Sequence, residues 1–166
     1  MGGVVSQPPC RRITLIFGVS NYNVRKAQVA DIDGIKQIAD SHKRELGFLR
    51  RPSLLASIGR DEIFVAEANN KIVGFVEYHH RRDEQTTLYN IVVEPDYRGL
   101  NVGRGLVEAL IHETQSYDKK FILLKCPTDL ESNGFYESLD FAIHIIENGK
   151  RRPLNVWRKD LEIGIN

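Results

Sequence analysis

A glycine-rich segment between residues 95 and 105 has the composition of a phosphate-binding turn. It follows the apolar run Ile91–Val93 and leads into a helical pattern. The first backbone N–H groups of a helix have no acceptor within the helix and lie at the positive end of its dipole, so they bind anions. Glycine also lets a phosphate approach the backbone closely. The sequence therefore predicts that this turn suits phosphate oxygens. It contains Arg98, Gly99, Leu100, Asn101, Val102, Gly103, Arg104 and Gly105.

This turn differs from two common phosphate-binding motifs. No Lys-Ser or Lys-Thr pair follows the glycines, as it does in the phosphate loop of the nucleotide hydrolases. The spacing Gly-x-Gly-x-x-Gly of the dinucleotide-binding folds is also missing. Neither of these nucleotide-binding classes is therefore supported.

The elements that position the turn alternate between strand and helix patterns. An antiparallel meander is expected to precede it, with Asn69-Asn70 forming a tight hairpin because asparagine tolerates positive φ. A long helix and a buried strand are expected to follow it, and such a crossover pairs two strands in parallel. The predicted strands are 24–29, 62–68, 71–80, 86–94, 121–126, 141–146 and 153–159; the predicted helices are 31–46, capped by Asp31, 52–58, 102–117 and 130–139.

This order of elements predicts an α+β fold with a mixed, mostly antiparallel central sheet of six to seven strands and helices on both faces. We expect a single domain over residues 24–166. Residues 1–23 are interpreted as an N-terminal extension, with one possible extra strand over Ile13–Val19 that ends in the polar turn Ser20–Asn23.

Composition excludes several functional classes. The 23 Lys and Arg residues nearly balance the 22 Asp and Glu residues, and a formal net charge of +1 gives no global field for a nucleic acid. No apolar stretch is long enough to span a bilayer, so no membrane partner is expected. The two cysteines, Cys10 and Cys126, are too few for a disulfide scaffold or a thiolate metal site, and we expect no metal and a cytoplasmic location.

Two motifs resemble those of the GCN5-related N-acetyltransferase (GNAT) superfamily. The segment from Pro95 to Gly103 is similar to the family's Arg/Gln-x-x-Gly-x-Gly/Ala motif, with Asn101 where the family usually has glycine. Asparagine visits the left-handed region more readily than most residues, so the turn can still form. The segment from Asn133 to Phe141 is similar to the family's Phe-Tyr-x-x-x-Gly-Phe segment, with Asp140 in place of glycine.

The resemblance implies the acyl-CoA N-acyltransferase fold, with acetyl-CoA as co-substrate and direct transfer of acetyl to a primary amine of a small molecule or a protein. The turn from Arg98 to Gly105 would hold the pyrophosphate, and Tyr136 would protonate the departing thiolate. Asn133 would reach the amides of the pantetheine arm. The main chain of Ile91, Val92 and Val93 would align this arm, and one N–H of this segment would polarise the acetyl carbonyl.

The general base stays open at this stage. Some members of the family carry Glu on the strand before the Tyr helix, where this chain has Leu124. Strand alternation places Glu77 and His79 on one face and Tyr78 and His80 on the other. The candidates for the base are Glu77, His79, His80, Tyr89, Asn90 or a water chain.

The acceptor and the oligomeric state stay open at this stage. The resemblance implies that the acceptor would be selected by the region between Ser41 and Ile58 and by the hairpin at residues 81–85. A monomer and a homodimer are both compatible with the sequence. The departures at Asn101, Asp140 and Leu124 keep an alternative open, a non-catalytic acyl-CoA binding or protein-interaction domain of the same fold.

Overall fold

A computed structural model of the chain describes residues 13–17 and 20–162. The described residues form two compact units. The first unit comprises those up to Glu77 together with Asn90–Leu110, and the second comprises Tyr78–Tyr89 and those from Ile111 onward. The predicted extension over residues 1–23 lies outside the described residues except at positions 13–17 and 20–23, and so does Cys10.

The strands are hydrogen-bonded in the order β1-β2-β3-β4-β5-β6-β8-β7. Strands β5 and β6 pair in parallel, as the crossover predicts, whereas the pairs β1·β2, β2·β3, β3·β4, β6·β8 and β7·β8 are antiparallel. The predicted α+β class is confirmed, and β1 is the extra strand expected in the extension. The bounds are β1 Ile13–Phe17, β2 Ser20–Lys26, β3 Ile63–Ala68, β4 Lys71–His80, β5 Gln85–Val93, β6 Phe121–Pro127, β7 Ala142–Asn148 and β8 Pro153–Asp160.

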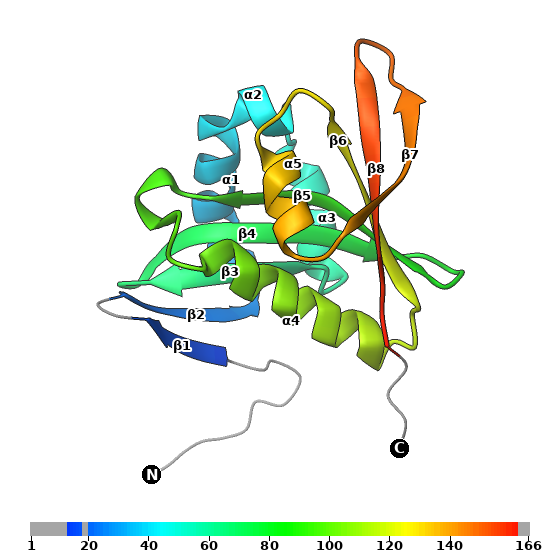
Figure 1. Ribbon diagram of the computed structural model, residues 1–166. Helices are drawn as coiled ribbons and strands as arrows, with labels where there is room; N and C mark the ends of the chain where they lie inside the picture. The colour runs from blue at the N-terminus through cyan, green and yellow to red at the C-terminus, as the bar shows by residue number, and fades with distance from the viewer. Residues whose placement is uncertain (1–12, 18–19, 163–166) are drawn as a thin grey trace. The chain divides into compact units, whose positions relative to one another are not determined.

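Helices cover both faces of the sheet in the first unit. The Arg25 side chain reaches Asp31 at the start of α1, whereas Tyr22 lies against Gly105 of α4, and residues an odd number of positions apart on a strand face opposite sides. Figure 1 shows α1 and α3 behind the strands and α4 in front of them. The helices are η1 Val29–Asp31, α1 Ile32–Ser41, α2 Lys43–Leu46, α3 Arg51–Gly59, η2 Pro95–Tyr97, α4 Val102–Ser116 and α5 Ser132–Ser138.

The core of the first unit lies between the sheet and the helices α1 and α3. The apolar positions of α1 recur at helical spacing, so that they form one stripe facing the sheet. They pack with side chains of α3 and of the central strands, and this burial is the main stabilising contribution of the unit. The cluster consists of Ala27, Ile32, Ile35, Ile38, Ala39, Leu54, Ile58, Ile63, Val65, Phe75 and Val92.

An ion pair fastens the end of β2 to the start of α1. The Arg25 guanidinium donates to Asp31 from Nη1 and Nη2, at 2.8 and 2.9 Å, and from Nε to Glu67 at 3.2 Å. Asp31 also accepts the Gln28 N–H at 2.7 Å. Burial alone would raise the pKa of Asp31, but the bonds from Arg25 and Gln28 outweigh it and lower the pKa. Asp31 stands at the predicted N-cap position, although its carboxylate makes no cap bond to α1.

Two local predictions are wrong. The turn expected over Ser20–Asn23 is the first part of β2, because Tyr22 is buried and this segment pairs with β1. The single helix expected to run to Leu46 is interrupted at His42, where φ is −121° and ψ is 32°. The ring nitrogen Nδ1 of His42 lies 2.9 Å from the carbonyl oxygen of Ile38, so the buried side chain satisfies an acceptor of the last turn of α1.

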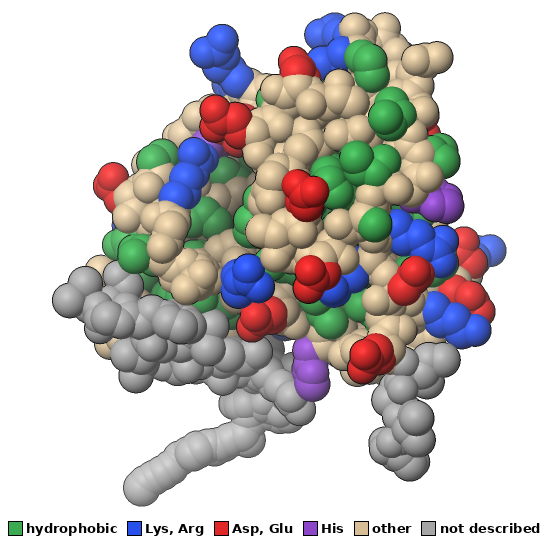
Figure 2. All heavy atoms as spheres, viewed as in Figure 1, with side chains coloured by type: hydrophobic (Ala, Val, Ile, Leu, Met, Phe, Trp, Pro, Cys, Tyr) green, Lys and Arg blue, Asp and Glu red, His purple; other side chains and the backbone are tan. Residues whose placement is uncertain are grey.

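The second unit contains the β7–β8 hairpin. Strand β8 of this hairpin pairs with β6 over the whole length of β6. Trp157 of β8 is buried and packs near Tyr136 of α5, with ring centroids 6.3 Å apart. Strand β7, in contrast, leaves three isoleucines half exposed or more, and Figure 2 shows hydrophobic side chains over this hairpin. These residues are Ile143, Ile145 and Ile146.

We expect Gly74→Ala to destabilise the protein. An added Cβ would lie 2.9 Å from the carbonyl oxygen of Val92, and this backbone oxygen of the neighbouring strand cannot swing away. The expected loss in the free energy of unfolding is about 2 kcal/mol, the usual cost of an overpacked core, and urea unfolding measures it.

The matched control is Gly59→Ala at the exposed end of α3, where no atom lies within 4 Å of the new methyl group. This variant should unfold like the wild type or be slightly more stable. If both variants unfolded at the same urea concentration, the close approach of Gly74 to Val92 would not affect the free energy of unfolding.

Candidate functional site

The predicted phosphate turn connects β5 to α4 within the first unit. Gly99 and Asn101 both have positive φ, 77° and 65°, so Asn101 adopts the left-handed conformation that the turn requires. The Nε atom of Arg98 donates to the carbonyl oxygen of Val93 at 3.0 Å, which folds the turn back onto the end of β5. Helix α4 starts directly afterwards with Val102, whose side chain is buried.

One carbonyl group fixes the start of α4. The main-chain oxygen of Asn101 accepts the Gly105 N–H at 2.9 Å and the Tyr22 hydroxyl at 2.7 Å. A Cβ at position 105 would lie 2.5 Å from the Tyr22 hydroxyl oxygen, so glycine is needed here for Tyr22 to reach the turn. Burial, together with the nearby charge of Glu108, raises the pKa of Tyr22 to about 12.

The electrostatics of the turn suit an anion. Arg98 and Arg104 are exposed, and the first N–H groups of α4 point out of the helix at the positive end of its dipole. The nearest ion-pair partner of Arg98 is Glu45 of α2, at a long 3.8 Å, and both side chains are about half exposed. This weak pair leaves the Arg98 guanidinium able to turn toward a phosphate.

The predicted pantetheine segment, Ile91–Val93, forms the end of β5. Its middle residue, Val92, is buried, and the Val92 carbonyl lies against Gly74 of β4. In the second unit, the described pairing of β5 with β6 ends at Thr87 opposite Leu123, although β6 continues to Pro127.

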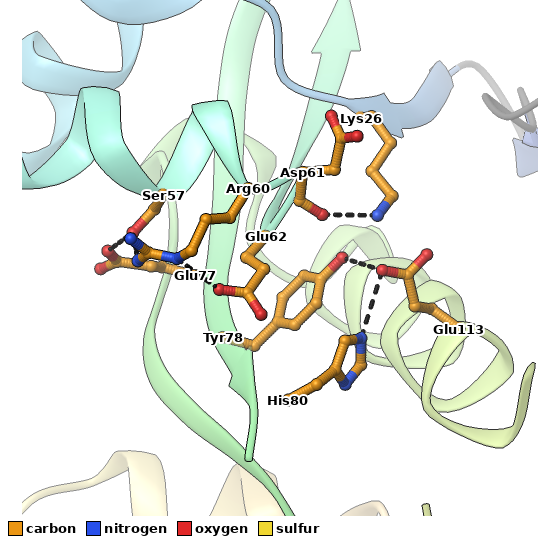
Figure 3. A network of polar contacts seen from close by, with 9 residues as sticks. All are labelled: Lys26, Ser57, Arg60, Asp61, Glu62, Glu77, Tyr78, His80 and Glu113. Carbon is orange, nitrogen blue, oxygen red and sulfur yellow. Dashed lines mark hydrogen bonds and ion pairs between the residues drawn. The ribbon is translucent and has the colours of Figure 1, made fainter. Parts of the chain in front are cut away.

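The first unit also holds a hydrogen-bonded carboxylate, Glu77 of β4. It accepts the Ser57 hydroxyl at 2.7 Å and the Asn90 side-chain amide at 2.8 Å. Arg60 donates to the same Ser57 oxygen at 3.2 Å and to Glu62 at 2.8 Å, as Figure 3 shows. Glu77 is nearly buried, and Asn90 directly precedes the Ile91–Val93 segment.

The base candidates His79, His80 and Tyr89 lie in the second unit, whereas Asn90 belongs to the first. Tyr78 donates to Glu113 of α4 at 2.7 Å, and the Nε2 atom of His80 lies 3.4 Å from the same carboxylate. The predicted alternation is therefore confirmed for Tyr78 and His80, which share one face of β4. The Nδ1 atom of His80 is engaged with the Thr86 hydroxyl at 2.7 Å, whereas Tyr89 is half exposed.

The segment from Asn133 to Phe141, which resembles the second family motif, also belongs to the second unit. Tyr136 of α5 is buried and packs edge-on against Phe141, with centroids 6.1 Å apart. Asp140 has a φ of 66°, so it adopts the left-handed conformation at the position where the family motif has glycine.

Asn133 has every hydrogen-bonding position of its side-chain amide in use. Its nitrogen donates to the carbonyl oxygens of Pro127 and Leu130 at 2.8 and 2.7 Å, and its oxygen accepts from Asn155 and Trp157 at 3.0 and 2.9 Å. A primary amide has two N–H groups and two lone pairs. Asn133 therefore joins α5 to β8, and its geometry favours this structural role over contact with a coenzyme.

The structure thus brings together, in the first unit, the segment Ile91–Val93, the turn from Arg98 to Gly105, and Glu77. Tyr136 and Asn133 are brought together with Trp157 in the second unit. Sequence reasoning missed the contribution of Tyr22 and of Ser57, since neither lies in a motif. The described residues contain no group of three or more side chains arranged to hold a metal ion and no helix long and apolar enough to cross a membrane.

Comparison with known proteins gives a consistent family. The model of the acetyltransferase (GNAT) domain matches residues 59–143, about half of the chain. An uncharacterized N-acetyltransferase of Pyropia yezoensis is 25% identical over 147 residues, which cover 83% of this chain and 78% of that protein.

Solved structures show the same fold. Ard1 from Thermoplasma volcanium matches with a TM-score of 0.76 and 18% identity, covering 85% of this chain and 98% of that one. The PaiA N-acetyltransferase from Thermoplasma acidophilum, crystallised in complex with coenzyme A, matches with a TM-score of 0.71 and 17% identity, covering 84% and 98%. At these identities the likeness concerns the fold alone.

We expect Tyr22→Phe to destabilise the protein in a pH-dependent way. Loss of the bond to Asn101 should lower the free energy of unfolding by about 1 kcal/mol at pH 8. Because burial raises the pKa of Tyr22 from 10.0 to about 12, the protonated phenol favours the folded state. The advantage of the wild type is therefore fully present below pH 10 and is lost as the pH rises through 12.

Urea unfolding of both proteins at pH 8, 10 and 11.5 measures this difference. Tyr89→Phe, at a half-exposed position of β5, is the matched control and should show no such trend. A constant difference between wild type and Tyr22→Phe over this range would contradict the assignment.

Proposed function

Because the chain belongs to the GNAT acetyltransferase family, we propose that it transfers the acetyl group of acetyl-CoA to a primary amine of a small molecule or a protein. The observation that carries this proposal is the segment from Ile91 to Gly105. There a strand end, a left-handed turn and a helix start are fixed in one unit by the Asn101 carbonyl.

In this proposal the coenzyme binds along that segment. The pyrophosphate lies at the first turn of α4, where N–H groups without intrahelical acceptors and the guanidinium groups of Arg98 and Arg104 neutralise its charge. The pantetheine arm follows the main chain of Ile91–Val93, and one N–H of this segment polarises the acetyl carbonyl. The coenzyme A bound by the PaiA protein of the same fold supports this choice of ligand.

We propose Glu77 as the group that accepts the proton of the acceptor amine. A lysine-like amine has a pKa of about 10.4 and must lose a proton before it attacks the thioester. The bonds from Ser57 and Asn90 hold the Glu77 carboxylate in one orientation, next to the strand segment assigned to the acetyl end of the coenzyme. The proton passes to Glu77 directly or through one water molecule.

The departing thiolate needs a proton, and we propose Tyr136 as its donor. The thiol of coenzyme A resembles cysteine, whose pKa is about 8.5, so a nearby phenol can protonate or hydrogen-bond the thiolate. This role rests on the match of residues 133–141 to the family segment. The amine attacks the carbonyl carbon, the carbon–sulfur bond breaks, and the amide and free coenzyme A are released.

The proposal predicts coenzyme binding and turnover that respond to different residues. Arg104→Ala should weaken acetyl-CoA binding about 10-fold, the effect of one charge-assisted hydrogen bond, in a calorimetric titration. Tyr136→Phe should lower the rate of thiol release with a panel of amines and leave the coenzyme affinity unchanged. Arg151→Ala, at an exposed position between β7 and β8, is the control and should behave like the wild type.

Absence of acetyl-CoA binding at millimolar concentration would exclude this function. Binding without turnover of any amine would favour the alternative, a non-catalytic acyl-CoA binding or protein-interaction domain. An unchanged rate of thiol release in Tyr136→Phe would remove Tyr136 from the mechanism.

Glu77→Gln tests the proposed base. The change keeps the shape of the side chain but removes its ability to take a proton, so kcat/KM at pH 7 should fall about 100-fold. Raising the pH should recover part of the rate, since more of the amine is then deprotonated. Glu62→Gln, at the buried partner of Arg60, is the control for loss of a buried carboxylate. A rate equal to the wild type would transfer the role to a water chain.

A further inference from the structure

An exposed phenylalanine lies in the loop between α2 and α3, in the first unit. Phe48 is 67% exposed, which is unusual for a large apolar side chain. The ammonium group of Lys36 lies 4.4 Å from the centre of its ring and that of Lys43 lies 5.4 Å from it. Two cations thus face an aromatic ring that water can reach.

The positive charge around this ring is neutralised only in part. Asp40 pairs with Lys36, whereas Asp33 pairs with Arg51 and Glu45 with Arg98. No carboxylate of the described residues pairs with Lys43, Arg44 or Arg50, and all three side chains are exposed. We call Lys36, Lys43, Arg44, Phe48 and Arg50 the Phe48 patch. Lys36 and Lys43 lie at the ring, and Arg44 and Arg50 are exposed neighbours of Phe48 in the chain. This surplus of cations suits an anionic group attached to an apolar stem.

Two contacts connect the Phe48 patch with the proposed site. Glu45, on the same short helix as Lys43, reaches Arg98 of the phosphate turn at 3.8 Å. Arg50 is the N-cap of α3, and this helix continues to Ser57, whose hydroxyl donates to Glu77 (Figure 3). Seven residues of helix span about 10 Å, so Arg50 lies about that distance along α3 from the residue that holds Glu77.

We propose that the acceptor is a peptide segment with acidic side chains, bound by the Phe48 patch. The inference rests on the proposed function, since it places the reacting amine at Glu77. Extended chain covers 3.3–3.6 Å per residue, so about 10 Å corresponds to about three residues between the acetylated amine and the first carboxylate. Arg50 binds this carboxylate, and Phe48 packs against the side-chain methylene groups. Polycationic acceptors are repelled by the same charges.

The test measures binding separately from turnover. Peptides with a free N-terminus, a fluorescent label at the C-terminus and Glu, Gln or Lys at positions 4 and 5 are titrated in the presence of coenzyme A, and anisotropy gives Kd. The Glu peptide should bind at least 10-fold more tightly than the Gln peptide, and this preference should shrink from 50 to 300 mM salt, since surface charges are screened. The double variant Lys43→Glu/Arg50→Glu should prefer the Lys peptide.

The matched control reverses two charges elsewhere, Lys150→Glu/Arg151→Glu in the β7–β8 turn, and should keep the preference for the Glu peptide. Melting curves confirm that both variants are folded. Equal affinity of the wild type for the Glu and Gln peptides would overturn the proposal. So would a loss of coenzyme affinity in Lys43→Glu/Arg50→Glu, because the Phe48 patch would then serve the phosphates of the coenzyme.

Acetylation rates test the spacing. Peptides with the Glu pair at positions 4 and 5 should have a kcat/KM about 10-fold higher than peptides with the pair at positions 9 and 10. Equal rates for the two spacings would contradict the proposed register. A Glu peptide that binds but is not acetylated, while another amine is, would contradict the peptide as acceptor and leave the transferase function intact. Absence of turnover with every amine would contradict the transferase function itself.

Discussion

The candidate site depends on one carbonyl group, the main-chain oxygen of Asn101. It receives the first α-helical hydrogen bond of α4 from Gly105 and a second bond from the buried hydroxyl of Tyr22. These two hydrogen bonds depend on two unusual features. Asn101 has a left-handed backbone, and position 105 has no side chain. Together they fix where β5 ends and where α4 presents its first N–H groups. A displaced Asn101 would redirect these groups, and with them any phosphate they bind.

Much of the fold can be predicted from the sequence because its signals are local. The strand patterns on either side of Asn69-Asn70 define a hairpin, and both residues have the positive φ, 53° and 61°, that asparagine tolerates. The break at His42 could not be predicted, since it depends on a side chain that bonds the preceding turn. Nor could the contact between Tyr22 and Asn101, which are 79 residues apart. A polar run such as Ser20–Asn23 is read as a turn when its distant partner is unknown.

The candidate site shows the same division between local and distant information. The motif residues 98–105 and the candidates Glu77 and Asn90 follow from residue type and strand position. The hydroxyl of Ser57, which completes the Glu77 network, belongs to a helix with no motif. Asn133 shows the reverse case. The family resemblance implies a ligand contact for it, whereas its amide is saturated by protein groups from three segments of the second unit.

The left-handed residues Asn101 and Asp140 also affect the unfolded state. Glycine at either position would leave the unfolded chain more conformations to sample, and folding would have to remove them. Asparagine and aspartate narrow that unfolded ensemble, while their short polar side chains tolerate the left-handed conformation better than most. Replacing the family's two glycines therefore stabilises these turns partly by lowering the conformational entropy of the unfolded chain. No contact of the folded protein shows this contribution.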